Sequence, residues 1–235
     1  TAKSNLGAAN PWRSSGDVQS QSEAREVPWE QILKSPGVWS VVATHAMSNI
    51  GFYSLLAWVP SFYSKGLGLN LEVAGLCAFL PYIFGAVASP VVGKLADGLL
   101  ADGWELVHVR RLFQGIAFFG PASCMIANAT IGPSLGAFAQ VSLLIAATVL
   151  KSGDRAGLFC NHADLSNRYS GALLALSTTA GAIAPIGVIA FIGRLIDETG
   201  SFSQGLFIPV AAAQIMGGLI YVTTSTSERQ SFDRL

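Results

Sequence analysis

The sequence predicts an all-α membrane protein with six transmembrane helices, on three observations. Hydrophobic residues make up 51% of the 235 residues and charged residues only 12%, about half of the ~25% that is usual in soluble domains. Five stretches of 21 to 39 residues contain no Asp, Glu, Lys or Arg, and a helix needs about 20 apolar residues to cross a bilayer. These stretches are continuously apolar, unlike the alternating segments of roughly ten residues in a membrane barrel.

The boundaries of the helices follow the charges. Four uncharged stretches have room for one span each, whereas the 39 residues between Arg111 and Lys151 have room for two. This long stretch is divided by a breaker sequence, Asn128-Ala129-Thr130-Ile131-Gly132-Pro133. The expected spans are 38–62, 73–93, 110–128, 134–160, 170–193 and 204–225.

The ends of the chain differ from the apolar bundle at 37–226. Residues 1–26 are polar and predict a flexible arm, 27–36 predict an amphipathic segment at the membrane surface, and 227–235 predict a cytoplasmic or stromal tail. Because the chain begins at Thr1 rather than Met, we expect a fragment or a processed product.

Six spans place both termini on one side of the lipid bilayer, and basic residues indicate which side. Only Lys65 and Arg194 fall on the opposite side. We therefore expect the termini to be cytoplasmic, or stromal in a plastid. The basic residues on the side of the termini are Lys34, Lys94, Arg110, Arg111, Arg168, Arg229 and Arg234.

Several function classes are disfavoured. Fourteen basic and fourteen acidic residues cancel, so no net charge attracts nucleic acid. Cys77, Cys124 and Cys160 lie apart in apolar stretches and form neither a disulfide framework nor a metal site. No HExxH, GxSxG or GxxxxGK[ST] motif appears, so we expect no enzyme activity, no metal and no cofactor beyond a coupling ion.

A turn of small and charged residues, Gly93-Lys94-Leu95-Ala96-Asp97-Gly98, is expected after the second span. Asp97 is expected to cap a helix start and to pair with an arginine at the start of the third span. Such a cluster can lock one conformation, although an ordinary solvated loop fits the spacing too. The candidate gating residues here are Gly93, Asp97, Arg110 and Arg111.

The run Gly93–Asp97 resembles the loop motif of the major facilitator superfamily. Within that superfamily the chain is similar to the anion:cation symporters, which include sialin, vesicular glutamate transporters and sodium/phosphate cotransporters, and most of all to the plastid anion transporters of plants and algae. Further runs carry this resemblance: Val27-Pro28-Trp29, Gly51-Phe52-Tyr53-Ser54-Leu55-Leu56-Ala57-Trp58-Val59-Pro60, Leu80-Pro81-Tyr82, Gly157-Leu158-Phe159-Cys160-Asn161-His162-Ala163-Asp164-Leu165-Ser166-Asn167-Arg168-Tyr169-Ser170-Gly171 and Ser227-Glu228-Arg229-Gln230.

The resemblance implies one half of the twelve-helix fold, helices seven to twelve, with 1–26 as a remnant of the central loop. Its partners would be the missing N-terminal six-helix half, the bilayer and a small anion. The implied function is secondary active transport of inorganic phosphate or a small organic anion, coupled to Na⁺ or H⁺, by alternating access. The implied location is the chloroplast envelope or the thylakoid membrane. The alternative is a non-transporting half-protein that binds or regulates a full-length membrane partner.

Four polar residues in the first span are candidate substrate ligands: His45, Ser48, Asn49 and Tyr53. Positions 45, 49 and 53 share one helical face, and polar groups inside a membrane usually face a cavity or a partner helix. By resemblance, Tyr53 matches a tyrosine of the substrate cavity. Ser48 stands where vesicular glutamate transporters have an arginine, which argues against glutamate as the substrate.

The fourth span carries three charges, Lys151, Asp154 and Arg155. Either the helix ends near Leu150, or it continues to about Asn161 and the charges line the cavity. In the second case Lys151 and Arg155 are candidate anion ligands. His45 and Asp154 are then the candidate ion-coupling groups.

Three residues after these charges are candidate gating residues: Asn161, Asp164 and Arg168. Asp164 and Arg168 are spaced i, i+4 and can pair on a continuous helix. By resemblance this segment forms a cytoplasmic gate.

Overall fold

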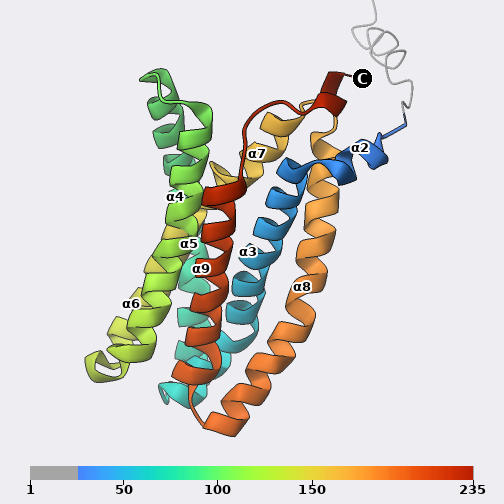
Figure 1. The fold of residues 1–235 in the computed structure, drawn as a ribbon. Coiled ribbons are helices and arrows are strands. Elements are labelled where there is room, and N and C mark those ends of the chain that lie inside the picture. The colour runs from blue at the N-terminus through green and yellow to red at the C-terminus, as the bar shows by residue number, and fades with distance from the viewer. Residues whose placement is uncertain (1–25, 235) are drawn as a thin grey trace, which may run out of the picture.

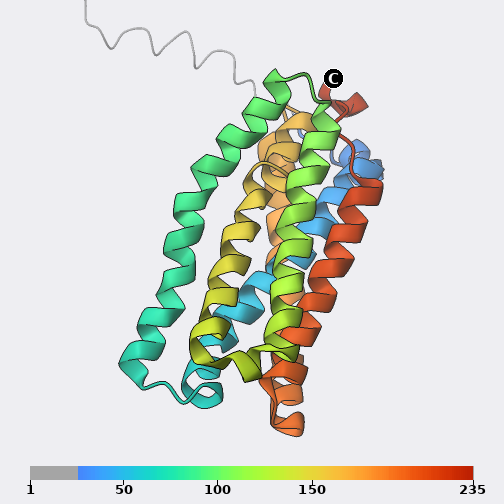
Figure 2. The same cartoon turned by 90° about the vertical axis from the view of Figure 1, so that its left-hand side faces the viewer.

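The computed structural model describes residues 26–234, and every regular element in this range is helical. Of the predicted arm, residues 1–25 lie outside the described part of the chain. Figures 1 and 2 show the long helices side by side in one bundle. The expected all-α class is therefore confirmed.

The helical segments follow the predicted spans closely at their centres and less closely at their ends. In chain order they are α2 (Trp29–Lys34), α3 (Pro36–Ser61), the π-helical turn η2 (Phe62–Gly66), α4 (Leu71–Ala101), α5 (Leu106–Thr130), α6 (Gly132–Lys151), the 3₁₀ turn η3 (Ser152–Arg155), α7 (Leu158–Leu165), α8 (Ser170–Thr199), the π-helical turn η4 (Ser203–Phe207), α9 (Ile208–Thr224) and η5 (Ser231–Arg234).

Five segments are long and apolar enough to cross a membrane by length and composition: α4, α5, Gly132–Leu165, α8 and Ser203–Thr224. The sixth, α3, has 26 residues and a length of about 39 Å. It falls below the five in hydropathy because His45 and Asn49 lie in its middle. Both α8 and α9 pack along α3, so protein covers two sides of the helix that carries these polar side chains.

Helix α4 corrects the predicted turn at 93–98. Asn70 caps its start by accepting a hydrogen bond from the Val73 backbone N–H at 2.9 Å, and the helix then continues to Ala101. The chain turns only at Gly103, whose φ of +88° favours glycine. Isolated glycines are tolerated within a helix at a modest cost, and here they do not end it.

The fourth predicted span, 134–160, is broken near its middle. The α-helix ends at Lys151, the 3₁₀ turn η3 follows, and α7 continues the same span to Leu165. Two glycines let this break lie directly against α5. A Cβ on Gly153 would lie 2.5 Å from the Phe113 carbonyl oxygen, and one on Gly157 would lie 2.5 Å from Oε1 of Gln114. The sequence left open whether the helix ends near Leu150 or continues to about Asn161. Both alternatives hold in part, because the α-helix ends at Lys151 while the apolar segment continues to Leu165.

The bundle has a tightly packed part and one peripheral helix. α3 packs against α8 and α9, and α5 packs against α6 and α9. α4 packs mainly against α6 and lies at the edge of the bundle in Figure 2. Glycines allow close helix contact, as at Gly51, where a side chain would collide with the Gln214 amide.

The C-terminal tail folds back onto the bundle. Phe232 of η5 is 1% exposed and packs in a cluster that includes Ile32 and Leu165. The Gln230 backbone N–H donates to the Leu165 carbonyl oxygen at 2.9 Å. The described part of the predicted tail, 227–234, is therefore docked over the end of α7, and α2 and η5 lie at the same end of the bundle (Figure 1).

Candidate functional site

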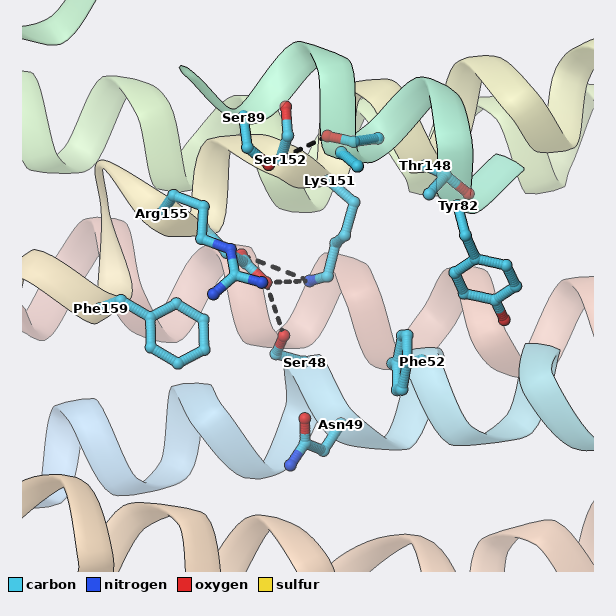
Figure 3. Close-up of a pocket in the computed structure, with 13 residues that line it drawn as sticks. Ser48, Asn49, Phe52, Tyr82, Ser89, Thr148, Lys151, Ser152, Arg155 and Phe159 are labelled. Atoms are coloured by element: carbon cyan, nitrogen blue, oxygen red, sulfur yellow. Dashed lines mark hydrogen bonds and ion pairs between the residues drawn. The ribbon is translucent and has the colours of Figure 1, made fainter. Parts of the chain in front are cut away.

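A cavity of about 350 Å³ lies between α3, α4 and the broken segment that joins α6 to α7 (Figure 3). Four of the candidate substrate ligands and the candidate coupling group Asp154 line it, although they come from segments about 100 residues apart. Its lining residues are Ser48, Asn49, Phe52, Tyr82, Gly85, Ala86, Ser89, Thr148, Lys151, Ser152, Asp154, Arg155 and Phe159.

Asp154 is the centre of the polar contacts in this cavity. Its carboxylate is buried, and Oδ2 accepts a hydrogen bond from Ser48 Oγ of α3 at 2.8 Å. The Lys151 Nζ lies 3.1 Å from the same oxygen. Oδ1 accepts from Nε2 of Gln114, on α5, at 2.7 Å. A buried carboxylate is stable only when its oxygens are paired in this way, so Asp154 ties three parts of the bundle together.

Gln114 holds the broken segment in place. While its Nε2 donates to Asp154, its Oε1 accepts from the Leu158 backbone N–H at 2.7 Å. That N–H opens α7, where the first backbone donors of a helix have no partner within it. One amide side chain therefore satisfies both the buried carboxylate and the start of α7.

The two cationic side chains of the cavity differ in their surroundings. Lys151 is mostly buried, with its Nζ 4.4 Å from the centroid of the Phe118 ring and 3.5 Å from Oε1 of Gln214. Arg155 is exposed, and its guanidinium carbon lies 5.0 Å from the centroid of the Phe159 ring. Within residues 26–234, Arg155 forms no ion pair.

These charges leave the cavity with an excess of positive charge, because Lys151 and Arg155 face the single carboxylate of Asp154. Asn49 also lines the cavity, but its amide nitrogen packs against α8, where a Cβ on Gly181 would lie 2.6 Å from it. The arrangement can hold a small anion through an ammonium and a guanidinium.

His45, another candidate in the first span, is not among the residues that line the cavity. It is buried, and its Nδ1 lies 3.0 Å from the hydroxyl of Ser177 on α8. His162 of α7 contacts the same hydroxyl through Nε2 at 2.8 Å. Two imidazoles thus share one serine between α3, α7 and α8.

Tyr53 does not line the cavity, and the aromatic residues that do are Phe52, Tyr82 and Phe159. Tyr53 is 38% exposed and packs edge-on to Phe52, with 5.2 Å between the ring centroids. A strict four-residue spacing placed it with His45 and Asn49, but the cavity opens toward α4, on the side of Ser48 and Phe52.

The expected pair of Asp164 with Arg168 is wrong. α7 ends at Leu165, so the two residues do not lie on one helix. Asp164 instead accepts from Nε and Nη2 of Arg110, at 2.7 and 3.1 Å. Arg168 is exposed, with its guanidinium carbon 5.5 Å from the Tyr169 ring centroid.

The other candidate gating residues take separate positions at this end of the bundle. Arg111 donates to the Ser225 carbonyl oxygen at 2.6 Å. Asn161 donates to the Thr226 carbonyl oxygen at 2.9 Å. Gly93 and Asp97 lie within α4, and Asp97 is exposed and forms no ion pair with a described residue. The expected pairing of Asp97 with an arginine is therefore not present in this conformation.

No group of three or more potential metal ligands is found within residues 26–234. The sequence analysis missed Gln114, Gln214 and Ser177, which contact Asp154, Lys151 and His45 respectively. A signal for the two glutamines was present, because an amide side chain within an apolar span is costly unless it has a partner.

Long apolar helices that surround a charged cavity define a polytopic membrane protein of the all-α class. The chain belongs to the Major Facilitator Superfamily, whose family model matches residues 5–152.

The chain is also similar to named plastid proteins. It is 34% identical over 212 residues to "Probable anion transporter 6, chloroplastic" of Arabidopsis thaliana, over 90% of this chain and 41% of the relative. It is 31% identical to "Sodium-dependent phosphate transport protein 1, chloroplastic" and 32% identical to "Ascorbate transporter, chloroplastic" of the same species, over 89% and 86% of this chain and 40% and 37% of the relatives. The chain spans about two fifths of the length of these relatives.

Proposed function

We propose that this chain forms one half of a secondary active transporter for inorganic phosphate or a small organic anion in a plastid membrane, and that it is not an enzyme. The observation that carries the proposal is the excess of positive charge in the cavity, where Lys151 and Arg155 face one carboxylate, Asp154. The names of the relatives support an anion as substrate and a plastid as location.

Alternating access requires a second six-helix half, because substrates of this superfamily lie at the interface of two halves. The cavity lies beside α4, whose main packing partner is α6. In this proposal the second half closes the cavity, the termini of the chain are stromal, and Na⁺ or H⁺ drives transport. Because Lys151 pairs with Asp154 at 3.1 Å, an incoming anion competes with the carboxylate for the ammonium.

The alternative is a half-protein that binds or regulates a full-length membrane partner without transport. Arg110, Asp164 and the docked tail favour a bundle that folds as a unit, since they close one of its ends without another chain. The two possibilities differ in what the gene encodes ahead of Thr1.

The test compares two proteins in proteoliposomes: the product of the complete reading frame and the 235-residue chain alone. Uptake of radiolabelled phosphate and ascorbate is measured under an imposed Na⁺ or pH gradient. We expect uptake only by the complete protein and its loss in Lys151→Gln, with Lys65→Gln as the matched control at the other end of the bundle. Absence of uptake of either anion in the complete protein, or equal loss in both variants, contradicts the proposal.

A further inference from the structure

A buried pair of histidines lies beside the cavity and is not used by the anion site. His45 on α3 is 4% exposed, His162 on α7 is 3% exposed, and Ser177 on α8 is fully buried between them. His162 Nδ1 lies 2.9 Å from the Leu158 carbonyl oxygen, and its Nε2 lies 2.8 Å from the Ser177 hydroxyl. His45 Nδ1 lies 3.0 Å from the same hydroxyl.

These contacts fix where the hydrogens lie when both imidazoles are neutral. A carbonyl oxygen only accepts, so Nδ1 of His162 carries the hydrogen that points to Leu158. A neutral imidazole has one N–H, so Nε2 of His162 accepts the hydrogen of Ser177. The Ser177 oxygen then accepts from Nδ1 of His45. The result is one directed chain in which each of these three contacts has one hydrogen.

A second arrangement of the same atoms holds one more proton. The Leu174 carbonyl oxygen lies 3.1 Å from the Ser177 oxygen. When His162 carries hydrogens on both nitrogens, its Nε2–H donates to Ser177, and the hydroxyl turns to donate to Leu174 instead. No heavy atom has to move, the three earlier contacts keep one hydrogen each, and the contact with Leu174 gains one. The two arrangements differ by a single proton on Nε2 of His162.

The charges around this array connect it to the cavity. The ring of Phe159, which lines the cavity together with Asp154 and Lys151, lies edge-on to His45 with 5.5 Å between the ring centroids. Asn49, one turn further along α3, also lines the cavity. His162 lies on α7, and the charged residue Asp164 of this helix is paired with Arg110 of α5. The charged residues of α8 lie in its last two turns: Arg194, Asp197 and Glu198.

Resting on the transport function proposed above, we propose that His45, Ser177 and His162 form the proton-binding site that couples H⁺ to the anion, with Nε2 of His162 as the atom that takes the proton. The proton comes from water on one side of the membrane, an N–H bond forms, and no other covalent bond changes. Its release on the other side reverses the step. An anion bound to Lys151 and Arg155 adds negative charge near the array and favours the imidazolium.

The protonation is tested directly by nitrogen NMR of the ¹⁵N-histidine-labelled protein in nanodiscs. The chain has three histidines, and His108 is exposed and serves as the internal reference. We expect His162 to carry hydrogen on Nδ1 alone at high pH and on both nitrogens at low pH, within about pH 5 to 8. Added phosphate is expected to raise the midpoint. A hydrogen on Nε2 alone at high pH, or no change of His162 over this range, overturns the proposal.

The coupling is tested with the complete protein in proteoliposomes. One coupled proton gives about tenfold anion accumulation per unit of pH gradient. We expect His162→Gln to lose this dependence while anion exchange without a gradient stays measurable, and His108→Gln to keep it. Ser177→Ala is expected to lose it too, because the chain between the imidazoles is broken. A tenfold effect that survives in His162→Gln overturns the proposal.

The two proposals fail in different ways. If the wild-type protein takes up no anion while His162 titrates as described, transport fails and the proton site stands. If uptake follows a Na⁺ gradient and ignores the pH gradient, transport stands and the proton site as coupling device is wrong. The NMR measurement uses the wild-type protein, so it decides the protonation even if a variant does not fold.

Discussion

Arg110 and Asp164 form a two-pronged ion pair, in which Nε and Nη2 of the guanidinium donate to the two carboxylate oxygens at 2.7 and 3.1 Å. The third guanidinium nitrogen, Nη1, donates to the Ala156 carbonyl oxygen at 2.9 Å. Both side chains of the pair are only about one tenth exposed. The pair joins the start of α5 to α7 and fixes the far side of the break in the fourth span.

Asp164→Asn is expected to lower the free energy of unfolding by about 3–5 kcal/mol, because it leaves the buried Arg110 cation without its partner. The measurement is thermal or denaturant unfolding of the protein in detergent. Glu198→Gln is the matched control, because Glu198 pairs with Arg194 on the surface at 2.7 Å. Its cost should stay below about 1 kcal/mol. Equal effects of the two variants would show that the pair is not buried in solution.

Gly153→Ala is expected to destabilise the protein by about 1–3 kcal/mol through overpacking. The added Cβ would lie 2.5 Å from the Phe113 carbonyl oxygen, which is backbone and cannot turn away. Gly187→Ala on α8 is the control, since its Cβ would meet nothing within 4 Å. The control is expected to be neutral or to gain up to about 1 kcal/mol of helix propensity. The same unfolding assay compares both, and a neutral Gly153→Ala would contradict the close contact of the break with α5.

Arg155→Gln is expected to weaken phosphate binding about tenfold, the lower end of the loss of a hydrogen bond to a charged group. Because Arg155 is exposed and has no ion-pair partner within residues 26–234, its loss should leave the fold intact. Binding of radiolabelled phosphate to the purified complete protein, at fixed salt, gives the Kd. Arg194→Gln at the other end of the bundle is the control. An unchanged Kd in Arg155→Gln would remove this guanidinium from the anion site.

Docking of the C-terminal tail is expected to depend on pH through Asp233. The Ser166 hydroxyl, the Arg168 backbone N–H and the Arg229 side chain lower the pKa of this carboxyl below its ordinary value of 3.8. A group whose pKa is lower in the docked state stabilises that state above its ordinary pKa and loses this contribution as the pH falls through the lowered value.

The tail should therefore be docked at neutral pH and become more mobile below about pH 4. A spin label at Ser231 reports this mobility. Asp233→Asn should give a label that is more mobile at neutral pH and insensitive to acidification, whereas Asp102→Asn, an exposed carboxyl in the turn after α4, should behave as the wild type. A mobility that does not change with pH in the wild type would contradict the role of Asp233.

The sequence predicted the centres of the spans because a charge inside hydrocarbon is expensive, so uncharged stretches mark the membrane. It misplaced the end of α4, since the motif at Gly93–Asp97 was interpreted as a turn while the chain remains helical to Ala101. A charged residue can mark where a helix leaves the membrane, but it does not end the helix. The chain leaves the helical conformation here only near Gly103, which has a positive φ.

The structure brings Ser48 together with Lys151, Asp154 and Arg155, which the sequence analysis had selected separately as polar groups in apolar spans. The sequence alone could not show which partners these side chains have. Gln114 lies 40 residues from Asp154, and Asp164 pairs with Arg110 rather than with Arg168. Sequence spacing predicts neighbours on one helix, whereas these contacts depend on how helices cross and on where α7 ends.

The shared end of α2 and η5 has a practical consequence for optical experiments. A fluorescent donor attached at Glu26 and an acceptor attached at Ser231 would lie at the same end of the bundle, which also carries the pair of Arg110 and Asp164. A quencher that does not cross the bilayer would then reach both fluorophores or neither. Energy transfer between them would follow the release of the tail, while the cavity between α3 and α4 stays free of labels.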